Sequence, residues 1–332
     1  MRARFLDLVN KVTAPRLSAT TLRLLVVSLS CGVTLLAAQG VAQAKSDAPT
    51  IRVADIGHGI ALHYVDQGAG LPVIFVHGSL SDVGYWADQI PAFATHYRAI
   101  AYSRRYNYPN DNPARPGYSA VIDAEDLAAL IRTLRLGKAV IVGHSYGALT
   151  ALFLAAKHPE LVSALVLAEP PAVSLLNHLP GNEAKTGKAM FEDIQQRMVA
   201  PMRHAFAQGD RDAGIAVFID YVFNDPHAWV KMPEDSRKET LRDAHEWDVM
   251  MTTGTLFPDL EPSAVRKITA PVLLLSGAKS YPFLGLITKE LTRLLPRNQS
   301  IVVSDAGHQM WYQYPDECRK FVEEFLAQNG VP

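Results

Sequence analysis

The residues best suited to chemistry are in the pentapeptide Gly143-His144-Ser145-Tyr146-Gly147. This pattern directly follows the apolar run 139–143, which predicts a buried strand, and directly precedes a helical pattern at 146–157. Its glycines permit a sharp strand-to-helix turn on which Ser145 adopts strained backbone angles and projects its hydroxyl group. A helix N-terminus at this point also favours negative charge on a bound oxyanion. The pattern predicts that Ser145 is a nucleophile; the alternative is a glycine-rich turn with an idle serine.

A serine hydroxyl needs a neighbouring base, and His308 is the candidate. It follows Ala306-Gly307, between the last predicted strand and the last predicted helix. The carboxyl ends of parallel strands meet at one edge of a sheet, so His308 should lie on the same edge as Ser145. The other histidines fall in loops, in turns where they pack, or in a helical insertion. We therefore predict that His308 is the general base.

The elements that must position these residues alternate between strand and helix. Two short alternating patterns around Gly57 and Gly59 predict a hairpin, and continuous apolar runs predict buried parallel strands. Helical spacing of apolar residues occurs between the runs. The hairpin strands are 51–55 and 60–66, the further strands are 72–76, 97–102, 139–143, 164–168, 271–276 and 300–304, and the helices are 120–136, 146–157, 284–295 and 310–327.

The alternation is interrupted once. Residues 170–262 contain no convincing apolar strand but do contain helical stretches at 189–208, 212–223 and 234–253, separated by turns with proline and glycine. The sequence predicts an α/β fold with a mostly parallel sheet flanked by helices. Residues 45–169 and 263–332 form its core, and 170–262 form a helical cap insertion.

Over most of residues 51–328 the chain resembles the α/β-hydrolase fold family, in particular its lid-bearing serine esterases and dehalogenases. The resemblance rests on His77-Gly78, on Gly143–Gly147, on Gly307-His308, and on an insertion where that family has its helical cap. It implies a third catalytic residue, an acid located between the nucleophile and the histidine in the chain.

The acid is where this sequence departs from the family. The usual site, the turn after strand 271–276, reads Gly277–Pro282 and has no carboxylate. Part of the family uses the turn after the preceding strand, where this chain has Glu169 before two prolines. We predict that Glu169 orients His308 and stabilises its imidazolium form. Asp305 is the rival, and the absence of a direct acid is a further alternative.

An oxyanion hole needs two backbone N–H groups. The first is expected from Tyr146, the residue after the nucleophile. The resemblance implies that the residue following His77-Gly78 donates the second, which selects Ser79; Leu80 is the alternative because the register of this loop is open.

The sequence gives no sign of a cofactor or a metal. His245–Val249 fails the HExxH pattern at its last position, and neither a GxGxxG nor a P-loop motif is present. Arg104 and Arg105 follow a strand at the catalytic edge; we expect them to be solvated, and the alternative is that they bind an acidic substrate. An apolar pocket between sheet and cap is expected. Each of its candidate lining residues, taken singly, is more often a core residue than a substrate contact, but together they favour an apolar pocket. They are Trp86, Phe191, Phe218, Tyr221, Trp247, Met250, Met251 and Trp311.

Residues 1–44 have the order of a secretory signal peptide. A basic lead precedes the apolar run 24–38, and Ala42-Gln43-Ala44 is a cleavage pattern before Lys45. The apolar run is shorter than the roughly 20 residues that span a bilayer, so an uncleaved anchor is the less favoured alternative. We expect a periplasmic or secreted protein without a stable membrane span after cleavage.

The 332-residue chain carries a net charge of -1, which argues against nucleic acid as a partner. A serine nucleophile favours acyl transfer to water. The sequence therefore predicts an enzyme that hydrolyses a small, apolar carboxylic ester, thioester or lactone through an acyl-enzyme intermediate. One alternative is a ligand-binding sensor on the hydrolase fold. Another is carbon–carbon bond hydrolysis, perhydrolysis or acyl transfer to an alcohol by the same triad. The oligomeric state stays open.

Overall fold

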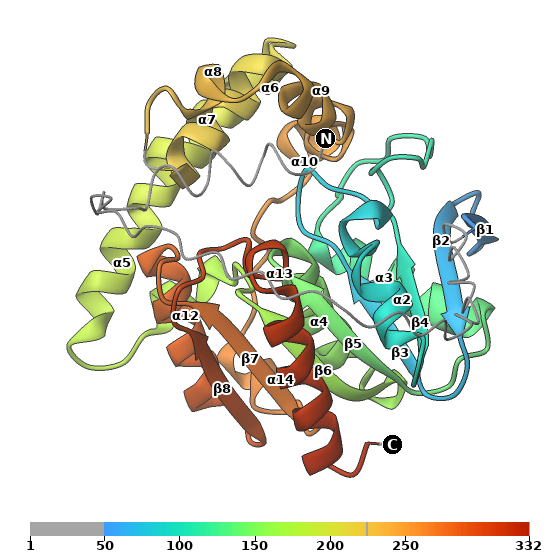
Figure 1. Ribbon diagram of the computed structural model, residues 1–332. Helices are drawn as coiled ribbons and strands as arrows, with labels where there is room; N and C mark the ends of the chain where they lie inside the picture. Colours follow the sequence, from blue (N-terminus) through green and yellow to red (C-terminus); the bar gives the residue numbers. More distant parts are fainter. Residues whose placement is uncertain (1–49, 224, 332) are drawn as a thin grey trace, which may run out of the picture. The chain divides into compact units, whose positions relative to one another are not determined.

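The computed structural model describes residues 50–223 and 225–331 of the chain. The predicted signal peptide lies outside the described residues. The described part is built on one eight-stranded sheet with the strand order β1-β2-β4-β3-β5-β6-β7-β8 (Figure 1). The strands are β1 (Arg52–Asp55), β2 (Ala61–Gly68), β3 (Pro72–Val76), β4 (Arg98–Tyr102), β5 (Ala139–His144), β6 (Val162–Ala168), β7 (Val272–Gly277) and β8 (Asn298–Val303).

The directions of the strands in the sheet agree with those that the sequence predicts. The predicted hairpin is present, because β1 and β2 pair antiparallel with Asp55 opposite Ala61. Strand β2 is also antiparallel to β4, and all pairs from β4 through β8 are parallel. Every residue of β3 and β5 is buried, as expected for strands that are covered on both faces. The predicted α/β-hydrolase fold with a mostly parallel sheet is confirmed.

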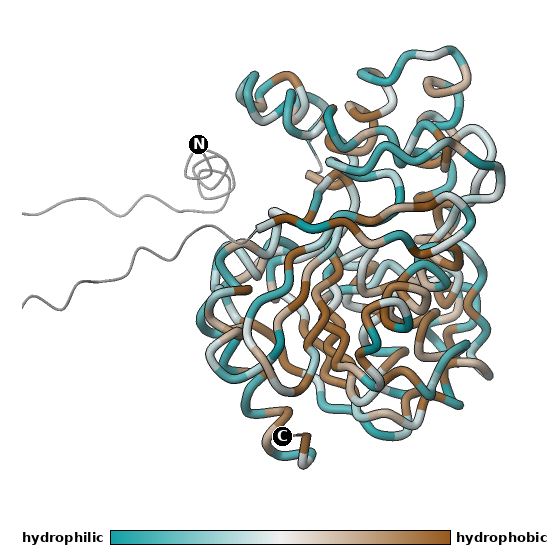
Figure 2. Tube along the Cα trace, turned by 90° about the vertical axis from the view of Figure 1, so that its right-hand side faces the viewer, coloured by the Kyte–Doolittle hydropathy of each residue, from teal (hydrophilic) through white to brown (hydrophobic). Residues whose placement is uncertain are grey.

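Helices cover both faces of the sheet, and Figure 2 shows the hydrophobic residues concentrated along the central strands between them. On one face, side chains of α2 and α14 form a buried cluster with Phe75 and its neighbours. Helices α3, α4 and α12 pack on the other face. The bounds are η1 (Val83–Trp86), α2 (Gln89–Phe93), α3 (Ala120–Thr133), α4 (Tyr146–Lys157), η2 (Pro159–Leu161), α11 (Pro262–Val265), α12 (Pro282–Leu294), α13 (Met310–Gln313) and α14 (Pro315–Gln328).

The segment between β6 and β7 is helical, and its helices α5 to α10 gather beyond one end of the sheet (Figure 1). Where the predicted cap begins and ends as a folding unit stays a prediction. The bounds are η3 (Val173–His178), α5 (Glu183–Ile194), the π-helical η4 (Gln195–Val199), α6 (Ala200–Ala207), α7 (Arg211–Phe223), α8 (Ala228–Lys231), α9 (Glu234–Arg242) and α10 (His245–Thr253).

Two helices that the pattern predicts as continuous are each broken. The stretch 234–253 is two helices, α9 and α10, and Asp243 at the break accepts a hydrogen bond from the backbone N–H of Tyr108 at 2.9 Å. The stretch 310–327 is interrupted at Tyr314, because the residue before a proline is disfavoured in the helical conformation. The first break coincides with a tertiary contact, and local sterics explain the second.

Candidate active site

Ser145 lies on the sharp turn that its glycines predict. Strand β5 ends at His144 and helix α4 begins at Tyr146, so Ser145 is the one residue between them. Its backbone angles are φ 53° and ψ -123°, a conformation that residues with a side chain rarely adopt. The Ser145 N–H donates to the carbonyl of Ala168 at 2.8 Å, which ties the turn to the end of β6. Strained backbone held by its surroundings is a frequent property of functional sites.

The two glycines of the motif are required by close backbone packing. A Cβ atom on Gly147 would lie 2.2 Å from the carbonyl oxygen of Val76 and 2.5 Å from that of His77. A Cβ atom on Gly143 would lie 2.6 Å from the Cα atom of Ala148. Helix α4 therefore begins directly against the end of β3, which keeps Ser145 beside the loop that follows this strand.

Glu169 and His308 meet at the same edge of the sheet. The Oε2 atom of Glu169 lies 2.6 Å from Nδ1 of His308. The carboxylate is buried and also accepts hydrogen bonds from the Gly277 N–H at 2.8 Å and the Ser280 hydroxyl at 2.7 Å. Asp305 is exposed and binds the ammonium group of Lys279 at 2.9 Å. Of the two predicted candidates for the acid, the structure brings Glu169 to the histidine.

His308 is held through its backbone as well as through its ring. The buried His144 ring lies with Nε2 2.8 Å from the carbonyl oxygen of His308, so this nitrogen is the donor. Burial lowers the pKa of His144 well below its ordinary value, which keeps the ring neutral with one N–H. The ring of Tyr281 lies on another side of His308, with 5.6 Å between the two ring centroids.

The loop after β3, residues 77–80, passes directly beside Ser145. A Cβ atom on Gly78 would lie 3.1 Å from the Cβ atom of Ser145. Leu80 has a left-handed backbone with φ 54°, and its N–H donates to Oε1 of Glu246 in α10 at 2.7 Å. The Leu80 N–H is thus already engaged by the cap segment. Ser79 remains the predicted second oxyanion donor beside Tyr146, whose N–H belongs to the first turn of α4 and has no acceptor within that helix.

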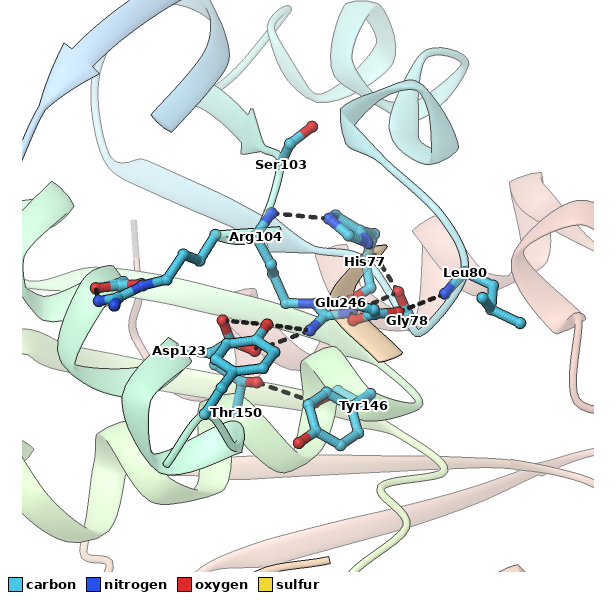
Figure 3. A network of polar contacts seen from close by, with 12 residues as sticks. His77, Gly78, Leu80, Ser103, Arg104, Asp123, Tyr146, Thr150 and Glu246 are labelled. Atoms are coloured by element: carbon cyan, nitrogen blue, oxygen red, sulfur yellow. Dashed lines mark hydrogen bonds and ion pairs between the residues drawn. The ribbon is translucent and has the colours of Figure 1, made fainter. Parts of the chain in front are cut away.

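The expectation that Arg104 is solvated is wrong. Its side chain is fully buried and is paired with two carboxylates, Asp123 at 2.8 Å and Glu246 at 2.5 Å (Figure 3). It also donates to the carbonyl oxygen of Gly78 at 3.1 Å. Arg105 is mostly buried as well and pairs with Asp126. No local signal marks Arg104 as buried, because a charge is buried only when it is paired, and its partners Asp123 and Glu246 lie 19 and 142 residues away.

Two of the candidate pocket residues belong to the core, which is the commoner place for each of them taken singly. Trp86 and Trp311 pack against each other, with ring centroids 5.1 Å apart, inside the core cluster. Tyr221, in contrast, lines an open cleft of about 350 Å³ between α5, α7 and the start of α12. The residue before this start is Tyr281, whose ring contacts that of His308. Besides Tyr221, the cleft is lined by Thr186, Ala189, Met190, Asp193, Ile194, Pro282 and Phe283.

Sequence reasoning missed two groups that hold the acid and one that holds the loop after β3. Gly277 and Ser280 occupy the turn that lacks a carboxylate, and there they donate to Glu169 instead of supplying an acid. Glu246 comes from the cap segment, 166 residues from Leu80, and no local pattern marks it.

Across residues 50–223 and 225–331, no group of three or more His, Cys, Asp or Glu side chains is placed to hold a metal ion. Within the same ranges, no helix is both long and apolar enough to cross a membrane.

A sheet of this order, with a serine on a strained strand-to-helix turn and an acid–histidine pair at the same edge, defines the class of α/β hydrolases. Family comparison agrees, because the model described as the alpha/beta hydrolase fold matches residues 72–313. The chain belongs to this α/β-hydrolase family.

Individual relatives are similar over most of the chain. The 2-(acetamidomethylene)succinate hydrolase of Mesorhizobium japonicum is 30% identical over 287 residues, which cover 86% of this chain and 98% of the relative. The 2-hydroxy-6-oxo-6-(2'-aminophenyl)hexa-2,4-dienoic acid hydrolase of Metapseudomonas resinovorans is 24% identical, covering 88% and 96%. The crystal structure of the enol-lactonase from Burkholderia xenovorans superposes with a TM-score of 0.64 at 20% identity, covering 82% and 99%. The last likeness shows the fold alone.

Proposed function

We propose that this protein is a serine hydrolase that cleaves a small, apolar carboxylic ester, thioester or lactone through an acyl-enzyme intermediate. The observation that carries the proposal is the contact of 2.6 Å between Glu169 and His308, at the edge where Ser145 occupies its strained turn. An acid, a histidine and a serine in this order are the three groups that acyl transfer needs.

In the first half of the reaction, the Ser145 hydroxyl attacks the carbonyl carbon of the substrate and gives its proton to Nε2 of His308. Nδ1 of His308 donates to Glu169, so Nε2 is the ring nitrogen free to accept this proton. The negative oxygen of the tetrahedral intermediate accepts hydrogen bonds from the Ser79 and Tyr146 N–H groups. The bond to the leaving group then breaks, and the leaving group takes the proton from His308.

In the second half, water attacks the acyl-enzyme. His308 accepts a proton from the water and returns it to the Ser145 oxygen as the acid product leaves. The carboxylate of Glu169 stabilises the imidazolium that forms in each half, and its hydrogen bonds from Gly277 and Ser280 hold it in one orientation. A buried carboxylate with three such contacts stays in place without reorganisation during the reaction.

We place the acyl group of the substrate in the open cleft lined by Met190, Ile194 and Phe283, because this cleft reaches Pro282, the neighbour of Tyr281, whose ring contacts that of His308. Its lining is mostly apolar, with Thr186 and Asp193 as polar members. The relatives named as hydrolases support hydrolysis as the reaction class. We also propose a periplasmic or secreted location, from the predicted signal peptide.

Labelling with a fluorophosphonate tests the proposal directly, because this reagent reacts with an activated serine. We expect labelling of the wild-type protein and turnover of p-nitrophenyl esters with short acyl chains. The Ser145→Ala variant should lose the label and lower kcat by about 10⁴-fold or more. Equal labelling of the wild type and of this variant would show that Ser145 is not the nucleophile. A folded wild-type protein that neither reacts nor hydrolyses any ester would favour the ligand-binding sensor instead.

The same triad also serves carbon–carbon bond hydrolysis, perhydrolysis and acyl transfer to an alcohol. Product analysis separates these reactions from ester hydrolysis. With an ester and water alone, the proposed reaction yields only the acid and the alcohol. Transfer of the acyl group to an added alcohol in preference to water would identify an acyltransferase.

A further inference from the structure

Helix α10, in the segment between β6 and β7, makes a buried polar contact with the rest of the fold. Its carboxylate Glu246 is fully buried and divides its two oxygens between separate partners. Oε1 accepts from the backbone N–H of Leu80 at 2.7 Å, and Oε2 accepts from Nη2 of Arg104 at 2.5 Å (Figure 3). One cap side chain therefore contacts the loop after β3 and the loop after β4 together.

Arg104 also holds the loop after β3. Its Nη2 donates to the Gly78 carbonyl at 3.1 Å, its Nε to the His77 carbonyl at 3.3 Å, and its backbone N–H to Nε2 of His77 at 3.0 Å. Residues 77, 78 and 80 are thus all hydrogen-bonded to Arg104 or Glu246. Ser79, the predicted donor to the oxyanion, is the residue between these fixed neighbours.

The contact between Arg104 and Glu246 restricts the movement of both side chains, because neither charge is exposed to water. The side chains of Arg104 and Glu246 are each 0% exposed. A buried charge that loses its partner has a large energetic cost, so neither group can move away from the other without a replacement. Leu80 itself has a left-handed backbone, with φ 54°, which needs such external support in a residue other than glycine.

We propose that Glu246 is a positioning residue for the oxyanion hole: its carboxylate fixes Leu80 and Arg104, and thereby directs the Ser79 N–H toward the oxygen that becomes negative. This inference rests on the proposed function. It assigns to the cap segment a part in catalysis that is separate from binding the substrate. Displacement of α10 would release the Leu80 N–H and loosen the oxyanion loop.

Two variants separate geometry from charge. Glu246→Asp keeps the charge beside Arg104, but its shorter side chain cannot span both Leu80 and Arg104. Glu246→Gln keeps the length, but its amide leaves one of the two donors without an acceptor. We expect each variant to lower kcat by about 10- to 100-fold with KM changed less than about threefold, because a misplaced oxyanion donor weakens transition-state binding alone. Rates are normalised to active sites titrated to completion with a fluorophosphonate, so that loss of folded protein does not lower the measured kcat.

Asp243→Ala is the matched control. Asp243 is buried in the same segment and also joins it to the rest of the fold, but through the N–H of Tyr108 and not through the oxyanion loop. We expect this variant to lose stability while its kcat per titrated site changes less than about threefold. A kcat loss in Asp243→Ala as large as in the Glu246 variants would overturn the proposal, because it would show a general effect of loosening the cap. Wild-type kcat in both Glu246 variants would overturn it as well.

Hydrogen exchange at the Leu80 amide gives a readout that needs no turnover. This amide is hydrogen-bonded to Glu246, and we expect its exchange to be at least about tenfold faster in both Glu246 variants than in the wild type and in Asp243→Ala. Unchanged exchange would overturn the positioning role. If the wild-type protein proves unable to hydrolyse any ester, the proposed function fails, yet this measurement still decides whether Glu246 holds the loop.

Discussion

Glu169 and His308 are 139 residues apart in the sequence, yet their side chains are 2.6 Å apart across the end of a strand that belongs to neither of them. Glu169 follows β6 and His308 follows β8, and β7 lies between these strands in the sheet. The turn after β7 fills the gap, because the Gly277 N–H and the Ser280 hydroxyl each donate to the Glu169 carboxylate. The turn after β7 is a frequent location of the catalytic acid in this family. In this chain the turn instead donates hydrogen bonds to Glu169, which follows the neighbouring strand β6.

Exchange of the two candidate acids should have very different effects on turnover. Glu169→Gln removes the charge that stabilises the imidazolium of His308, and we expect kcat to fall by up to about 10⁴-fold. Asp305→Asn should lower kcat less than about tenfold, because an exposed ion pair such as that of Asp305 with Lys279 contributes about 0–1 kcal/mol. Steady-state kinetics on one p-nitrophenyl ester decide the matter. Similar losses in the two variants would reject Glu169 as the acid.

Gly147 should tolerate no side chain. A Cβ atom there would lie 2.2 Å from the Val76 carbonyl oxygen, so that Gly147→Ala must separate α4 from the end of β3. We expect a fall in melting temperature of several degrees or more and a loss of activity of at least about tenfold. Gly285→Ala is the control, because Gly285 lies in α12 with open space around its Cα atom and alanine favours the helix. A Gly147→Ala protein with wild-type stability and activity would contradict the packing described for the motif.

Asp243 should make stability depend on pH between about 4 and 7. Burial, and then the nearby charge of Asp82, raise the pKa of Asp243 from 3.8 to about 7. In this range the folded state keeps a proton that the unfolded chain releases, so stability falls as pH rises toward 7 and is level above it. The effect is at most about 4 kcal/mol, from three pKa units at 1.36 kcal/mol each.

Asp243→Asn should flatten this dependence, because asparagine keeps the oxygen that accepts from Tyr108 and does not titrate. Melting temperatures measured from pH 4 to pH 8 provide the test, with Asp316→Asn as an exposed control that leaves the dependence unchanged. An identical pH profile in the wild type and in Asp243→Asn would show that Asp243 does not titrate in this range.

The exported protein should begin at Lys45. The basic lead, the apolar run and Ala42-Gln43-Ala44 predict cleavage at this point. N-terminal sequencing of protein from the native host, together with fractionation of the cells, checks the expectation. A chain that begins at Met1 and remains with the membrane fraction would indicate an anchor.

The centre of the sheet could be predicted from the sequence because its central strands are buried on both faces. Runs such as Pro72–Val76 and Ala139–Gly143 are continuously apolar, and the structure has strands at both places. The break at Asp243 is not marked by the apolar pattern, and in the structure it coincides with a hydrogen bond from Tyr108, 135 residues away. A periodic pattern records which face of a helix is buried but not which distant group interrupts it.

The candidate site also contains residues that the sequence predicts and residues that it does not. Ser145 and His308 are marked by local glycines and by their place after a strand, so short-range rules find them. Arg104 and Glu246 are a buried pair whose members are far apart in the chain, and a lone arginine after a strand predicts a solvated charge until its partner is known. Buried charges pair only in the folded state, so the local sequence around either residue does not show that the pair forms.

The contact of Glu246 with Leu80 has a practical consequence for protein engineering. Exchange of the cap for that of a relative is an obvious way to alter the substrate range of such a fold. In this chain the exchange would also remove Glu246, the acceptor for the backbone N–H of Leu80 in the core. The loop after β3 in the resulting chimera would then lose this hydrogen bond. A donor cap would have to present a carboxylate in the place of Glu246, facing Arg104, or the graft would need a compensating change in the loop at residues 77–80.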